Sequence, residues 1–169
     1  MNSAMSPLDL TLRVVHVLGA CIWVGAAFFA AWFLIPSLRD AGPDAAKVMA
    51  GVQRRKWMVV LPVIATTTVL TGFWLYRPYM GAEGNAAKYL GFGGVIGTIA
   101  LILGAGLASR FMNGASKLAA EAAAMTDPAA RGAAMKTAAV LRDKALLWAR
   151  VVSVLVIVAA VLMTMAMYV

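Results

Sequence analysis

His16 is the only histidine in the chain, and it lies in a long apolar stretch with Arg13 and Trp23. One face of an α-helix is predicted by residues that recur at intervals of three or four: Asp9, Arg13, His16, Ala20, Trp23 and Ala27. A neutral imidazole can coordinate haem iron or copper, and an arginine one turn away can pair with a haem propionate. This face is therefore a candidate cofactor site with His16 as the metal ligand.

The residues next to His16 fit the same hypothesis. Gly19 is small, which leaves room for a flat ring, and Trp23 could pack on that ring. An ordinary structural interpretation is also open, in which His16 hydrogen-bonds a carbonyl or threonine of a neighbouring helix and the aromatic side chains only pack. The spacing alone does not choose between these two interpretations.

Several other kinds of chemistry are absent from the sequence. With a single histidine and a single cysteine, Cys21, the chain has no serine–histidine–acid set, no internal disulfide and no cysteine-rich metal site. No acidic residue lies deep in an apolar stretch, as a proton-driven carrier would usually require. No phosphate-binding loop or dinucleotide fingerprint is present.

The composition is that of a membrane protein. Of the 169 residues, 63% are hydrophobic and 13% are charged, whereas a soluble domain has about half and about a quarter. The formal net charge is +8, but the basic residues lie in short connectors between apolar stretches, as membrane topology produces. Nucleic acid is therefore not expected as a partner, and the lipid bilayer is.

Four stretches have the length of about 20 residues that a membrane-spanning helix needs. We predict an all-α integral membrane four-helix bundle, formed by one domain over residues 1–169, with spans at roughly residues 8–35, 57–76, 89–108 and 146–168. Pro36 is expected to end the first helix and Pro62 to kink the second. Gly93 and Gly97 give the third span a small face for close packing, within the bundle or between protomers.

The distribution of basic residues predicts the orientation. The first connector and the third connector carry most of them: Arg39, Lys47, Arg54, Arg55, Lys56, Arg110, Lys117, Arg131, Lys136, Arg142 and Lys144. Positive charge favours the cytoplasmic side, so both termini and the second connector are expected outside. His16 then lies about 12 Å below the outer surface, at about 1.5 Å per helical residue. Arg77, in the second connector, shares that side and completes the predicted haem site.

The third connector is rich in alanine, which favours helix. Thr126-Asp127-Pro128 is a typical helix start, with an acceptor side chain before a proline at the first helical position. We therefore expect the third and fourth helices to continue beyond the membrane as a cytoplasmic helical hairpin.

Methionines indicate a second kind of metal site. Those expected on the outer side are Met1, Met5, Met80, Met163, Met165 and Met167. Thioether sulfur suits Cu(I), although methionine also fills apolar helices without any such role. Met163 and Met167 are therefore candidate copper ligands.

The motif His16-x-x-Gly19-x-x-x-Trp23-x-Gly25 resembles the first helix of the copper-resistance D family of bacterial membrane proteins. The continuation, which ends Ile35-Pro36-Ser37-Leu38, is similar to the haem-binding bacterial membrane protoporphyrinogen oxidases, where arginine stands in place of the serine. The resemblance covers about the first quarter of the chain. It implies a helical bundle in which His16 ligates a metal or haem. With no second histidine, a bis-histidine haem within one protomer is excluded.

The favoured hypothesis is a haem-b-binding protein of the bacterial inner (plasma) membrane in redox or haem/copper metabolism. His16 would be the axial ligand, with Arg13, Gly19, Trp23 and Arg77 around the ring. Whether it is an enzyme stays open; as an oxidoreductase it would act on a quinol or a porphyrin, and a homo-oligomer could share the haem. The alternatives are a copper-binding or copper-transport protein without haem, and a non-catalytic scaffold acting through the hairpin.

Overall fold

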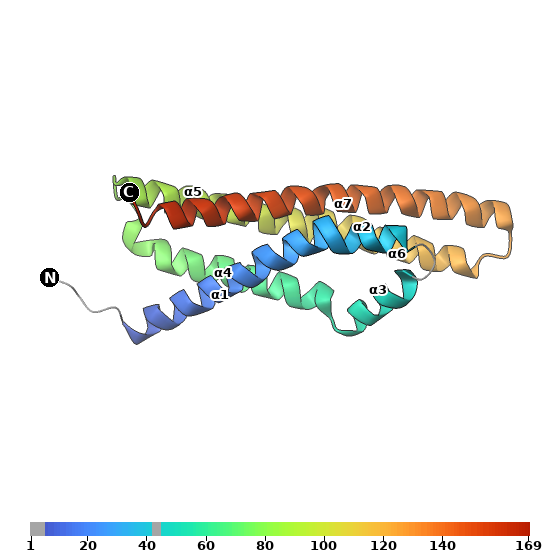
Figure 1. Ribbon diagram of the computed structural model, residues 1–169, viewed down its shortest axis with the longest axis horizontal. Helices are drawn as coiled ribbons and strands as arrows, with labels where there is room; N and C mark the ends of the chain where they lie inside the picture. Colours follow the sequence, from blue (N-terminus) through green and yellow to red (C-terminus); the bar gives the residue numbers. More distant parts are fainter. Residues whose placement is uncertain (1–5, 42–44) are drawn as a thin grey trace.

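The computed structural model describes residues 6–41 and 45–169, and all of their secondary structure is helical (Figure 1). The elements are α1 (Pro7–Phe29), η1 (Ala30–Leu34), α2 (Ile35–Asp40), α3 (Ala45–Arg54), α4 (Trp57–Tyr76), η3 (Arg77–Tyr79), α5 (Asn85–Leu103), η4 (Gly104–Ala108), α6 (Ser109–Ala124) and α7 (Pro128–Met165). Within these residues, four continuous helices are long and apolar enough to cross a membrane: Pro7–Asp40, Trp57–Tyr79, Asn85–Ala124 and Pro128–Met165. The prediction of an all-α protein with four such helices is confirmed.

Two helix starts follow directly from local sequence. The Ser6 hydroxyl accepts a hydrogen bond from the Asp9 N–H at 3.1 Å, and Pro7 follows it as the first helical residue. The Asp127 carboxylate accepts from the N–H groups of Ala129 and Ala130, as expected for an acceptor that precedes a proline. Each cap satisfies main-chain donors that have no partner inside the helix.

The prediction that Pro36 ends the first helix is wrong. The helix continues to Asp40, because the π-helical turn η1 lies directly before the proline. In this turn the Ile35 N–H bonds to the Ala30 carbonyl, one residue further back than in an α-helix. The wider turn accommodates a proline ring that would clash with a regular α-helical ladder.

The helices form two close pairs (Figure 1). α5 packs along the later part of α7, and α6 packs along its earlier part, while α1 crosses α4. The start of α1 and the C-terminus lie at one end of the long axis, and the turn between α6 and α7 lies at the other. Trp23, Ala27, Ala65, Ala100, Val152 and Val156 form the buried core between the helices.

Most large apolar side chains point away from this core. Leu70 and Ile102 are each 63% exposed, and similar side chains cover the outside of all four long helices. In water such a surface would be an aggregation hazard, whereas a bilayer solvates it. The chain is therefore a multi-pass membrane protein.

Gly93 is a close-packing position within the bundle. A Cβ atom at Gly93 would lie 2.8 Å from Met163 Cγ and 3.2 Å from the Ala159 carbonyl oxygen, both on α7. Gly97 is buried, but a Cβ there would meet nothing within 4 Å. The small face of α5 therefore packs within the protomer through Gly93.

Candidate functional site at the α1–α4 crossing

Two glycines bring α1 and α4 together where the helices cross. Gly19 of α1 lies directly against Thr68 of α4, so that a Cβ there would overlap the threonine hydroxyl. Gly72 of α4 lies against the ring of His16, and a Cβ there would be 2.8 Å from His16 Cε1. The two contacts are reciprocal, since in each one a glycine of one helix lies against a side chain of the other helix. Such small positions allow close approach of helices in a membrane.

His16 uses this close approach to reach the main chain of α4. Its Nδ1 lies 2.8 Å from the Thr68 carbonyl oxygen. A carbonyl only accepts hydrogen bonds, so Nδ1 carries the proton and donates, and Nε2 of the neutral ring keeps its lone pair. The missing side chain at Gly72, one turn after Thr68, leaves that carbonyl accessible to the imidazole. The geometry of the ring thus follows from one glycine.

The threonines around His16 are mostly satisfied within their own helix. Thr68 Oγ1 donates to the Ile64 carbonyl at 2.8 Å, and Thr71 Oγ1 donates to the Thr67 carbonyl at 2.8 Å. Thr71 Oγ1 also lies 3.4 Å from His16 Nδ1, at the edge of hydrogen-bond distance. Both hydroxyls are buried against α1, so the polar groups of the two helices meet each other rather than lipid.

The remaining imidazole nitrogen is the chemically interesting one. In the described part of the chain, Nε2 of His16 makes no hydrogen bond and His16 is half-buried. A histidine that ligates a metal typically donates its other N–H to a carbonyl or carboxylate, which fixes the tautomer and orients the ring. The same Nδ1 bond would also serve a purely structural histidine. The expected hydrogen bond to a neighbouring carbonyl is confirmed, and it is compatible with both interpretations.

The other predicted haem residues are dispersed around this crossing. Gly19 is occupied by contact with Thr68, so it leaves no gap beside His16. Trp23 is 7% exposed and belongs to the core, two turns further along α1. Arg13 is exposed on α1.

Arg77 lies in a polar cluster that the sequence analysis did not predict. Its Cζ is 3.6 Å from the Trp74 ring centroid, and Trp74 Nε1 donates to Asp9 Oδ1 at 3.3 Å. The cluster joins the end of α4 to the start of α1, on the same two helices as His16. Arg77 and Trp74 are only three residues apart, but Asp9 lies 65 residues before Trp74, and no sequence spacing indicates that contact.

The candidate copper ligands take different positions. Met163 packs under Gly93 at the α5–α7 contact, while Met167 is 80% exposed near the C-terminus. Met1 and Met5 lie outside the described residues. Among the residues that the structure describes, no three or more histidine, cysteine, aspartate or glutamate side chains gather into a metal site.

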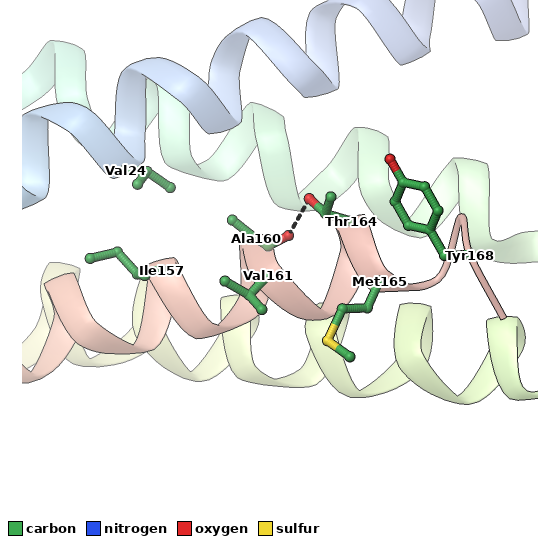
Figure 2. A pocket seen from close by; sticks show the side chains of 7 residues that line it. All are labelled: Val24, Ile157, Ala160, Val161, Thr164, Met165 and Tyr168. Carbon is green, nitrogen blue, oxygen red and sulfur yellow. Dashed lines mark hydrogen bonds between the residues drawn. The ribbon is translucent and has the colours of Figure 1, made fainter.

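Two hollows lie near these helices, and neither is lined by His16. A partly open pocket of about 160 Å³ has Trp23, Pro62 and Gly104 in its mainly apolar wall, and it is smaller than the roughly 300 Å³ of common ligand pockets. An open groove of about 320 Å³ runs between α1 and the end of α7. Figure 2 shows its lining: Val24, Ile157, Ala160, Val161, Thr164, Met165 and Tyr168. The Thr164 hydroxyl is already used, since it donates to the Ala160 carbonyl at 2.8 Å.

Comparison with known proteins adds no assignment: no family model, no curated protein and no solved structure matches this chain.

Proposed function

We propose that this protein binds haem b in the membrane through Nε2 of His16 and serves redox or haem/copper metabolism. The observation that supports this most is the bond from His16 Nδ1 to the Thr68 carbonyl, 2.8 Å long. It holds the proton on Nδ1, directs the lone pair of Nε2 away from that carbonyl, and fixes the orientation of the ring.

The chain's own residues would divide the work as follows. Thr68 and Gly72 fix the orientation of the His16 ring, and Gly19 and Trp23 hold α1 against its neighbours. Arg13, exposed one turn before His16, is the cation best placed along α1 to pair with a propionate. Arg77 lies at the same end of the helix pair but is stacked on Trp74, so its part is secondary.

With one histidine, each protomer can supply a single imidazole to the haem, and any further ligand would come from another residue type or from a second protomer. Haem supplies one-electron chemistry and, where an axial position is open, a place for a small ligand. A quinol or porphyrin is the substrate class that such a membrane site would oxidise.

The proposal includes an orientation in the bacterial plasma membrane. Both termini lie outside, and the basic connectors at residues 39–56 and 110–144 lie in the cytoplasm. The α6–α7 hairpin then projects into the cytoplasm, closed by the buried alanines Ala115, Ala122 and Ala138 between the two helices. Cysteine-accessibility labelling of single cysteines placed at residues 83 and 126, in a variant where Cys21 is replaced by serine, tests this orientation. Labelling of the first from outside and of the second only after permeabilisation is the expected result.

Titration of haemin into the purified protein tests the haem proposal. The wild type should take up haem with a sharp Soret band, and His16→Ala should bind at least about a hundredfold more weakly, since it lacks the iron ligand. Thr98→Val is the matched control, because Thr98 only bonds back to the Gly94 carbonyl in α5. Equal haem binding by the wild type and His16→Ala, or no uptake by either, would overturn the proposal.

A further inference from the structure

Arg150 is a charged residue inside the apolar part of α7. Its guanidinium carbon lies 5.0 Å from the centroid of the Trp32 ring, which belongs to η1. Its Nε atom is buried and has no hydrogen-bond partner among the residues that the structure describes. Charged groups in a membrane are normally paired, because leaving them unpaired costs several kcal/mol. Among the residues that the structure describes, none therefore supplies the counter-charge that the position of Arg150 favours.

The tryptophan beneath Arg150 is fixed in place. Trp32 Nε1 donates to Ser153 Oγ at 3.0 Å, and Ser153 Oγ donates to the Arg150 carbonyl at 2.8 Å. Ser153 is fully buried, whereas Trp32 is 43% exposed. Hydrogen bonds therefore fix Trp32 and Ser153 beside Arg150, and the partly exposed Trp32 ring makes this cluster accessible where η1 packs against α7.

The nearest acid on the same helix is already engaged. Asp143, seven residues before Arg150, pairs with Arg39 of α2 at 3.3 Å. Seven residues correspond to about 10 Å along a helix, so this pair lies two turns from Arg150. Both members are more than half exposed, which is typical of a pair in water or among lipid head groups. Arg150 thus lies about two helical turns deeper in the membrane than the Arg39–Asp143 pair, which marks the polar boundary.

The depth of Arg150 suits a lipid phosphate. Arg150 is fifteen residues from Met165, the last residue of α7, or about 22 Å, whereas the hydrocarbon layer is about 30 Å thick. Helical side chains lean toward the N-terminus, which here is the nearer membrane surface. A long arginine side chain can therefore reach the head-group region while its stem stays in lipid.

We infer that Arg150 and Trp32 form a binding site for the phosphate of an anionic phospholipid. Guanidinium binds phosphate through paired charged hydrogen bonds, and tryptophan favours the membrane interface. The other arginine–tryptophan pair, Arg77 on Trp74, differs because it already has an anion beside it, the Asp9 carboxylate. Only the Arg150 pair leaves an anion to be supplied from the bilayer. This inference is independent of haem.

Native mass spectrometry of delipidated protein in neutral detergent tests the inference, with phosphatidylglycerol, phosphatidylcholine and inorganic phosphate as separate probes. We expect a preference for phosphatidylglycerol and about a fivefold to tenfold loss of its affinity in Arg150→Gln, the size expected for one or two charge contacts. Arg77→Gln, the matched control, should keep wild-type affinity.

Arg150→Lys keeps the charge and guards against a folding defect in Arg150→Gln, so it should retain the preference for phosphatidylglycerol with weaker affinity. Equal binding of phosphatidylcholine, an equal loss in Arg77→Gln, or binding of inorganic phosphate alone as tight as that of phosphatidylglycerol would each overturn the inference.

Discussion

The α1–α4 crossing and the α5–α7 pair use the same packing device with different results. In each, a glycine lets a side chain of the neighbouring helix approach the main chain. Gly93 receives the apolar side chain of Met163, whereas Gly72 receives the imidazole of His16. The side chain that packs against the glycine therefore decides the result: an apolar side chain contributes only to stability, whereas an imidazole is also held in a defined orientation.

The two contacts also differ in how the nearby main-chain carbonyl is used. At Gly72 the imidazole reaches the carbonyl of Thr68 and hydrogen-bonds it. At Gly93 the closest main-chain atom is the Ala159 carbonyl oxygen, which faces a glycine with no donor side chain. Only the first contact orients an imidazole whose second nitrogen keeps its lone pair, so changes at the two glycines should have separable effects.

Gly72→Ala should have the larger effect of the substitutions at these two glycines. The new methyl group would lie 2.8 Å from His16 Cε1 and 3.2 Å from Nδ1, so the ring must leave its position. We expect haem affinity to fall at least about fivefold, because overpacking of this kind costs about 1–3 kcal/mol and about 1 kcal/mol corresponds to about fivefold. Haemin titration followed by the Soret band measures it. Unchanged affinity would show that the Gly72 contact does not orient the ligand.

Gly93→Ala should reduce stability while leaving haem affinity within about twofold of wild type. Its methyl group would lie 2.8 Å from Met163 Cγ, and the flexible methionine can move aside more easily than a hydrogen-bonded imidazole. We expect a loss of about 1 kcal/mol, at the lower end of overpacking costs. Thermal unfolding in detergent gives the stability, and a loss of haem affinity as large as that of Gly72→Ala would remove the contrast between the two pairs.

Thr71→Val should have the smallest effect. The Thr71 hydroxyl is 3.4 Å from His16 Nδ1 and already donates within α4, so it contributes little to the ring. Hydrogen bonds between membrane helices average about 0.6 kcal/mol, which corresponds to less than about a threefold change in haem affinity. The same haemin titration tests this, and a tenfold loss would show that Thr71, rather than the Thr68 carbonyl, positions His16.

Features determined by neighbouring residues could be predicted from the sequence, and those determined by other helices could not. Ser6-Pro7 and Asp127-Pro128 start helices because capping acts over one turn. Trp23 and Ala27 are buried as their helical phase predicts. The course of the chain at Pro36 depends on a π-turn that offsets the proline, and no local pattern announces it.

The candidate site shows the same limit. The histidine and its helix face follow from the sequence, but its partner, the Thr68 carbonyl, is a main-chain atom 52 residues away. Gly19 was expected to leave space for a ring, yet that space is filled by Thr68 from another helix. Gly72, which directly follows the threonine-rich residues 66–71, is the sequence signal that could have indicated this contact, because a glycine allows another helix to approach α4 closely.

Nitrogen NMR of protein labelled with ¹⁵N only in histidine tests whether Nε2 of His16 is the haem ligand, since His16 is the only histidine and its signals need no assignment. The proposal predicts a protonated Nδ1 and an unprotonated Nε2 in the haem-free protein. It further predicts that the Nε2 signal disappears through paramagnetic broadening when ferric haem is added in equal amount. A proton on Nε2, or two ring signals that are unaffected by haem, would contradict it.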